Sequence, residues 1–95
     1  MLLDELHAKR EQILALAARH GVTEVRVFGS VARGKERPDS DVDFLIKIDP
    51  TRSLTDLCRF KLDIEAFLQR ECDAISDRGL HPLLRDRILT EATPL

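Results

Sequence analysis

Two aspartates separated by one residue, Asp41 and Asp43, are the first candidate for a chemical site in this sequence. On a β-strand their side chains leave the same face, with Cα atoms roughly 6.6 Å apart. Two carboxylates this close repel each other, which raises the pKa of one of them, and a cation relieves the repulsion. Magnesium prefers a few carboxylate oxygens together with water and phosphate oxygens. The pair predicts a site for a metal-bound triphosphate, although the same spacing also occurs at solvent-exposed strand ends.

Twelve positions before Asp41, the chain has residues suited to binding phosphate. Phe28 is followed by Gly29, whose missing Cβ lets a phosphate approach the backbone. Ser30 then offers a hydroxyl group and the amide of a helix N-terminus. Alone, these residues would indicate an ordinary strand-to-helix turn with a serine N-cap. Beside the aspartates, we interpret Gly29 and Ser30 as nucleotide-binding.

Two further residues, Arg33 and Ser40, flank this region. The guanidinium of Arg33 matches phosphate in geometry and could reach it from the helix after Ser30, or it could simply lie in solvent. Ser40 has no histidine near it in sequence to act as a base. We therefore interpret Ser40 as a hydrogen-bonding or turn residue at the nucleotide site and not as a nucleophile.

The elements that must position these residues alternate between helical and strand patterns. Helical spacing predicts helices over 2–19, about 53–70 and from Pro82 onward, and β-branched or alternating runs predict strands at 24–28, 42–48 and 72–76. Ser53 and Asp56 have the spacing of a capping box. The residues expected to face inward from the last two helices are Leu57, Cys58, Ile64, Leu68, Leu84, Ile88, Leu89 and Ala92. This order predicts an α/β or α+β fold with a small mixed sheet backed by helices.

Bulk properties predict a single cytoplasmic domain over residues 1–95. A net charge of −2 gives no attraction to a polyanion, so we expect no direct nucleic-acid binding. No apolar run is long enough to cross a membrane. Cys58 and Cys72 are expected to be free, buried thiols. The three histidines, His7, His20 and His81, lack ligand spacing and are expected at the surface or at helix caps.

The stretch VRVFGSVARGKERPDSDVDFLIKID resembles the signature of the minimal nucleotidyltransferases of the polymerase-beta superfamily. The later run REC-Asp73-AIS resembles the third strand of that family, and the closing EATPL resembles its usual end. The resemblance implies the polymerase-beta-type fold. It also implies that Asp73 joins Asp41 and Asp43 as catalytic residues and metal ligands, although other acids, Asp63, Glu65, Glu71 and Asp77, lie nearby in sequence.

The resemblance implies an activity and a partner. It implies an Mg²⁺-dependent transfer of AMP from ATP to a hydroxyl of a protein, in which the chain is an antitoxin that silences a toxin of the HEPN ribonuclease type. One alternative is an antitoxin with a weak or inactive nucleotide site that neutralises its partner by stoichiometric binding. Another is an aminoglycoside-modifying enzyme that completes its acceptor site by dimerising, which drug-dependent pyrophosphate release would indicate.

Overall fold

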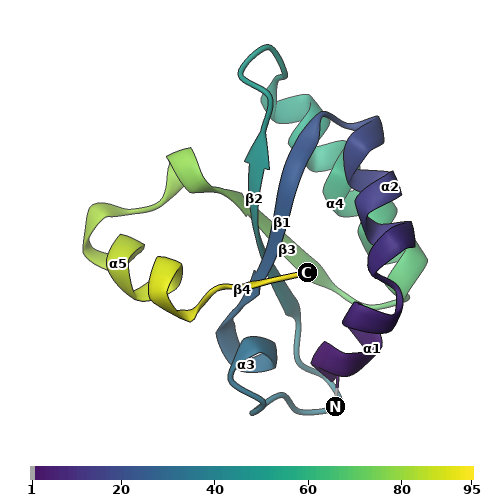
Figure 1. Cartoon of the computed structure of the whole chain (residues 1–95), viewed down its shortest axis with the longest axis vertical. Helices are drawn as coiled ribbons and strands as arrows, with labels where there is room; N and C mark the ends of the chain where they lie inside the picture. Colours follow the sequence, from purple (N-terminus) through teal and green to yellow (C-terminus); the bar gives the residue numbers. More distant parts are fainter. Residues whose placement is uncertain (1) are drawn as a thin grey trace.

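The structure, a computed structural model, describes residues 2–95 (Figure 1). Its elements in chain order are α1 (Leu2–Ala8), α2 (Arg10–Arg19), β1 (Val22–Phe28), α3 (Gly29–Ala32), β2 (Val42–Ile48), α4 (Leu54–Leu68), β3 (Cys72–Ser76), the 3₁₀ turn η1 (Asp77–Gly79), α5 (Pro82–Glu91) and β4 (Thr93–Pro94). The bounds of β2 and β3 are those predicted from sequence.

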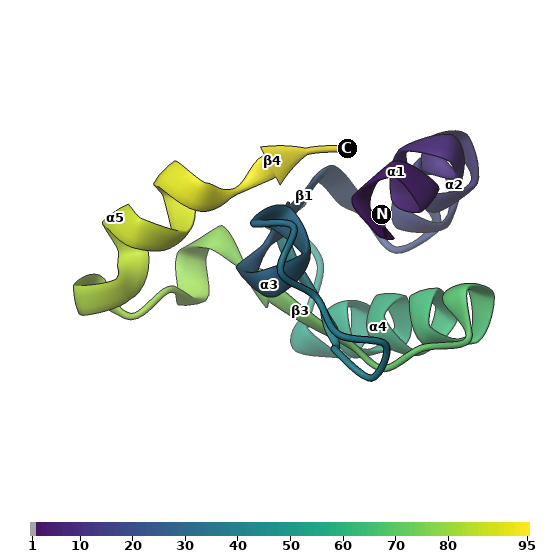
Figure 2. The ribbon, with the colours of Figure 1, turned by 90° about the horizontal axis from the view of Figure 1, so that it is seen from below.

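The four strands form one mixed sheet in the order β3-β2-β1-β4. Strand β1 is antiparallel to both β2 and β4, whereas β2 and β3 are parallel. Parallel neighbours need a crossover connection, and α4 supplies it. Helices α2 and α4 lie on one side of the sheet and α5 on the other (Figures 1 and 2). The predicted class, a small mixed sheet backed by helices, is confirmed.

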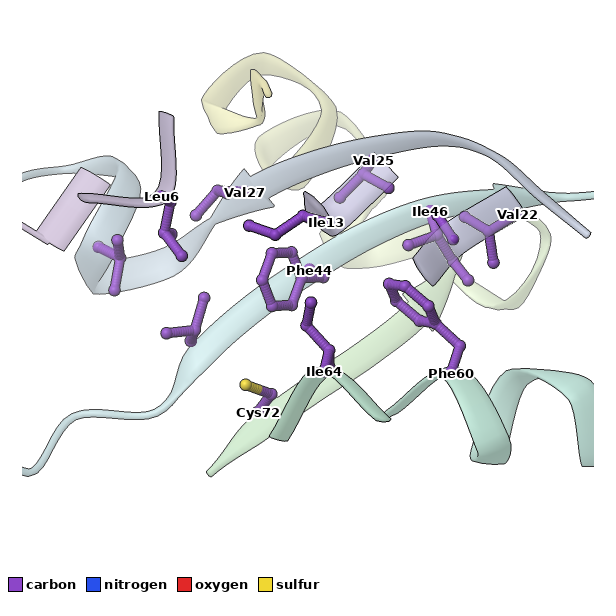
Figure 3. Close-up of a cluster of buried hydrophobic side chains, with 13 residues drawn as sticks. Leu6, Ile13, Val22, Val25, Val27, Phe44, Ile46, Phe60, Ile64 and Cys72 are labelled. Atoms are coloured by element: carbon purple, nitrogen blue, oxygen red, sulfur yellow. The ribbon is translucent and has the colours of Figure 1, made fainter. Parts of the chain in front are cut away.

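The hydrophobic core lies between the sheet and the helices α1, α2 and α4 (Figure 3). Phe44 of β2 and Phe60 of α4 are its largest fully buried side chains. Val42, Phe44 and Ile46 point to this side because alternate residues of a strand share a face. Asp43 lies between them in the sequence and therefore points to the opposite face, toward the side of α5.

The first predicted helix is divided in two. Lys9 separates α1 from α2 with backbone angles of φ −100° and ψ 14°, so the helix predicted over 2–19 is interrupted there. Gly21 ends α2 as expected, in the left-handed conformation that glycine favours. Helix α4 has the expected capping box, in which the Asp56 carboxylate accepts the Ser53 amide hydrogen at 3.0 Å. It ends at Leu68, because the next residue, Gln69, is left-handed, so the predicted end at Arg70 is too late.

Two of the side chains predicted to face the core do not. Cys58 is exposed, whereas Phe60 takes the inward position, since α4 turns about 100° per residue and the buried face follows Phe60 and Ile64. Both cysteines are nevertheless free, as predicted, and Cys72 is buried. Leu84 is 49% exposed, and no residue of α5 is buried, because this helix packs against little besides α3.

Strand β4 was not predicted from sequence. Its two residues pair with Arg26 and Val27 of β1, and the Leu95 amide donates to the Val25 carbonyl at 3.1 Å. Pro94 is compatible with this place because proline is tolerated on an edge strand, where one side of the strand needs no partner. Within residues 2–95, no helix has both the length and the apolar character needed to span a membrane.

Candidate active site

The register of the sheet brings Asp43 and Asp73 side by side. The two residues are direct partners in the parallel β2–β3 ladder, where neighbouring strands lie about 4.8 Å apart. Partners in register point to the same face, so both side chains leave the sheet opposite the core. Asp41 immediately precedes β2, two positions before Asp43. The structure thus places the three predicted aspartates at the amino ends of the neighbouring strands β2 and β3.

The electrostatics of Asp43 reflect this grouping. Burial is the largest cause that raises the pKa of Asp43, and the negative charges of Asp73 and Asp41 raise it further. Asp73 is the more accessible carboxylate, with 60% of its side chain exposed, and it lies 3.8 Å from the ammonium group of Lys61. The group therefore contains one shielded carboxyl and one that a solute can reach.

Gly29 lies directly against the carboxylates. Its φ of +76° is strained for any residue with a side chain, and a Cβ at this position would overlap the Oδ2 oxygen of Asp43. Phe28, just before it, is the register partner of Asp43 on β1. The predicted phosphate-binding turn, Gly29 and Ser30 at the start of α3, is therefore adjacent to the predicted metal ligands.

Ser40 stabilises the loop that leads into Asp41. Its hydroxyl accepts the Arg37 amide hydrogen at 2.7 Å, and its carbonyl accepts a hydrogen bond from Arg70 Nη1 at 2.8 Å. The Val42 amide donates to the Glu71 carbonyl at 3.1 Å. Ser40 thus acts as a turn residue, one of the two roles expected from sequence, and Arg70 emerges as a residue that positions the loop.

Arg33 forms an ion pair with Glu91, a residue that was not predicted from the sequence to belong to the site. Its guanidinium pairs with the carboxylate of Glu91, the last residue of α5. Both groups are near enough to influence Asp43, because Arg33 lowers its pKa and Glu91 raises it. A single glutamate at a helix end carries no local signal of such a role. The only trace in the sequence was the resemblance of the closing EATPL segment to the family.

The donor chemistry of the site suits a hard divalent cation. Asp41, Asp43 and Asp73 supply carboxylate oxygens, and the raised pKa of Asp43 expresses a repulsion that a cation would relieve. Within residues 2–95, no three acidic, imidazole or thiol groups are arranged as a ready metal site. Asp73, which is ion-paired with Lys61, would have to turn toward the other two aspartates to complete one.

The histidines have the structural roles predicted for them. His20 is the C-cap of α2, and its Nε2 lies 2.6 Å from Asp63 of α4. The Nδ1 of His81 accepts the Leu83 amide hydrogen at 3.2 Å and caps α5. His7 is exposed and lies near the Pro94 carbonyl. All three lie outside the group of aspartates.

The fold and this site define a nucleotidyltransferase domain. Residues 9–95 match the model of the nucleotidyltransferase domain family, and the chain belongs to that family. A solved structure described as a provisional minimal nucleotidyltransferase is 52% identical, with a TM-score of 0.86 over 98% of this chain and 95% of that chain. The resemblance seen in the sequence is thereby confirmed.

Two curated relatives are more specific. A protein of Methanocaldococcus jannaschii, provisionally named a protein adenylyltransferase, is 40% identical over 87% of this chain and 89% of its own length. The protein adenylyltransferase MntA of Thermococcus cleftensis is 34% identical over 80% of this chain and 77% of its own. A toxin–antitoxin crystal structure with AMP-PNP shares the fold at 17% identity, with a TM-score of 0.75 over 88% of this chain and 69% of that chain.

Proposed function

We propose that this chain transfers AMP from ATP to a hydroxyl group of a protein partner. The observation that carries the proposal is the in-register pairing of Asp43 with Asp73 beside Gly29, in a chain that belongs to the nucleotidyltransferase family. The two curated relatives named as protein adenylyltransferases support a protein acceptor. The chain itself has no tyrosine and cannot be its own acceptor at one.

In the proposed reaction, the acceptor oxygen attacks the α-phosphorus of ATP. The bond from that phosphorus to the oxygen bridging to the β-phosphate breaks, and pyrophosphate leaves. Asp73 accepts the hydroxyl proton, since its exposed carboxylate is open to an incoming acceptor. Gly29, Ser30 and Arg33 bind the phosphates. The rigid strands β1, β2 and β3 hold the residues that bind the acceptor hydroxyl and the leaving pyrophosphate in line on either side of the α-phosphorus.

We further propose that the reaction requires Mg²⁺ and takes place in the cytoplasm. Asp41, Asp43 and Asp73 would hold the ion, which when bound neutralises phosphate charge and stabilises the leaving pyrophosphate. Without a cation, these carboxylates would repel the triphosphate, so the same residues that make the site acidic make it dependent on the metal.

We propose a toxin of the HEPN type as the partner. A structure of a tri-AMPylated Shewanella oneidensis HEPN toxin with an MNT antitoxin shares the fold, at 14% identity and a TM-score of 0.69 over 93% of this chain and 69% of that chain. The acidic site lies on the side of the sheet opposite α1, α2 and α4, the side on which α5 lies (Figure 2). The exposed carboxylate of Asp73 is accessible to a second protein.

The test is transfer of label from α-labelled ATP, with Mg²⁺, to a HEPN-type protein, sought first in the reading frame adjacent to that of this chain. We expect label on that protein and loss of its ribonuclease activity. Asp43→Asn and Asp73→Asn should each lower the transfer rate by roughly 10²–10⁴-fold, and chelation of Mg²⁺ should stop it. Glu11→Gln, an exposed change on α2, is the matched control and should leave the rate unchanged.

A second function, neutralisation by stoichiometric binding, is favoured by the ion pair that draws Asp73 toward Lys61. The same experiment separates the two. A stable complex without label, and equal neutralisation by wild type and Asp43→Asn, would contradict catalysis and support binding.

A further inference from the structure

Arg33 is already paired with an anion in the structure. Its partner, Glu91, comes from the far end of the chain, and α3 and α5 meet at this point. A guanidinium binds carboxylate and phosphate through the same fork of N–H groups. The Glu91 carboxylate thus binds the same guanidinium, that of Arg33, that in the proposed function binds a phosphate of the nucleotide.

The two partners differ in their access to solvent. The Glu91 side chain is 16% exposed, whereas that of Arg33 is 43% exposed. Arg33 also lines a shallow, open surface depression together with Asp86, Arg87, Thr90 and Glu91. A phosphate could therefore approach Arg33 from solvent. Glu91, by contrast, would lose its ion-pair partner while still largely shielded from water, which is unfavourable for a carboxylate.

The backbone keeps Glu91 opposite Arg33. Helix α3 follows β1 without a break, so Arg33 is carried at the end of that strand. On the other side, β4 follows Glu91 after one residue, and Thr93 pairs with Val27 of the same strand. Both partners are therefore fixed to the same end of β1.

The pair is also close to the carboxylates. Glu91 adds to the negative charge that acts on Asp43, and Arg33 opposes it. Release of Glu91 from Arg33 would leave a fourth carboxylate beside three others, without its neutralising partner. The free energy needed to release Glu91 therefore weakens the binding of any anion that replaces it at Arg33.

We propose that Glu91 competes with the nucleotide's phosphate for Arg33 and thereby sets the affinity for the triphosphate. The proposal rests on the proposed function, in which Arg33 is a phosphate ligand. Glu91 is a positioning residue in this scheme, because it acts on the nucleotide through Arg33.

The test is the affinity for AMP-PNP with Mg²⁺, measured by calorimetry. Glu91→Gln removes the competing charge with little change of shape, and we expect binding to tighten by roughly two- to fivefold, the range for loss of a part-exposed ion pair. Glu24→Gln is the matched control. It removes the carboxylate of the Glu24–Arg26 pair, 2.5 Å, near the other end of β1, and should leave the affinity unchanged.

A double-mutant cycle with Arg33→Ala distinguishes the possible failures. We expect Arg33→Ala to weaken binding and Glu91→Gln to have no further effect in that background. Equal tightening by Glu91→Gln with and without Arg33 would mean that Glu91 acts by charge alone, which overturns the proposal. Unchanged affinity in Glu91→Gln, with weaker binding in Arg33→Ala, overturns it while leaving the proposed function intact.

Two further outcomes bear on the proposed function itself. If wild type does not bind AMP-PNP, both proposals fail. If Arg33→Ala binds it as well as wild type, Arg33 is not a phosphate ligand, and the proposal for Glu91 fails together with the role of Arg33 in the proposed function, while AMP transfer itself stands. Thermal unfolding verifies that each variant is folded. Should Glu91→Gln not fold, Glu91→Asp keeps the charge but shortens the side chain by one methylene, and the same tightening is expected.

Discussion

Among single residues, Gly29 has the least freedom to change. Its backbone adopts a conformation that side chains disfavour, and its missing Cβ leaves the space that the Asp43 carboxylate occupies. These two constraints are independent, because the first belongs to the turn between β1 and α3 and the second to contact with β2. Together they keep the turn that we propose to bind phosphate against the acidic residues.

Gly29→Ala should therefore damage both stability and nucleotide binding. The positive φ alone should cost more than about 1 kcal/mol of unfolding free energy, and displacement of Asp43 should weaken AMP-PNP binding by roughly tenfold or more. Chemical denaturation and calorimetry measure the two effects. Gly79→Ala is the control, since a Cβ there meets no atom within 4 Å and its φ is not positive. Equal behaviour of the two variants would contradict the role of Gly29.

The sequence predicted the local part of the site and not the distant part. Asp41, Asp43 and Gly29 could be chosen because short spacing and residue type carry their signal. Asp73 could be chosen only through the family resemblance, since the register of β3 against β2 is set by packing across α4. Glu91 could not be chosen at all, because its partner lies 58 positions earlier in the chain.

Among the elements, the loop between α3 and β2 depends on a residue outside it. Arg70, in the turn after α4, donates to the Ser40 carbonyl, the residue before Asp41. The loop is polar and mostly exposed, and this hydrogen bond joins its last turn to the segment after α4. The position of Asp41 is thereby coupled to the end of α4.

Arg70→Ala should slow AMP transfer by roughly tenfold, which corresponds to about 1.4 kcal/mol of lost transition-state stabilisation. The expected cause is a loss of order in the loop, so hydrogen exchange at residues 37–41 should rise in the same variant. Arg59→Ala, an exposed change on α4, serves as the control. Slower transfer with unchanged exchange would show that Arg70 acts on the nucleotide directly and not through the loop.

The accuracy of the element predictions followed the strength of the local signal. The bounds of β2 were correct because apolar alternation marks that strand, and those of β3 were correct because polar and turn residues flank its short run. The break at Lys9 was invisible to a helical pattern that continues through it. Strand β4 has two residues, one of them proline, and forms only because the edge of β1 is available to it.

For the whole molecule, the acidic site lowers the stability of the folded state at neutral pH. The pKa of Asp43 is raised in the folded protein, chiefly by burial and then by Asp73 and Asp41. A carboxyl with a raised pKa favours folding while it is protonated. That contribution is fully present below its unfolded pKa, near 3.8, and is lost as the pH rises through the higher folded value. At neutral pH the ionised group therefore opposes folding.

Asp43→Asn should consequently be more stable than wild type at pH 7 in the absence of metal and nucleotide. The gain should be roughly 0.5–2 kcal/mol, or a rise in Tm of about 4–8 °C per kcal/mol for a domain of this size. Unfolding measured between pH 7 and pH 4 should show the difference shrinking toward acid. A variant less stable than wild type at pH 7, or a difference that grows toward acid, would contradict this account.

The pairing of β1 with β4 also affects the order in which the chain can fold during synthesis. Val27 pairs with Thr93, 66 positions later, whereas the strands that carry the aspartates are complete at Ser76. As the chain leaves the ribosome, all three strands of the acidic sheet therefore emerge before Glu91 does. For that interval Arg33 lacks the carboxylate of Glu91, and an anion in solution can bind Arg33 without competition from that residue.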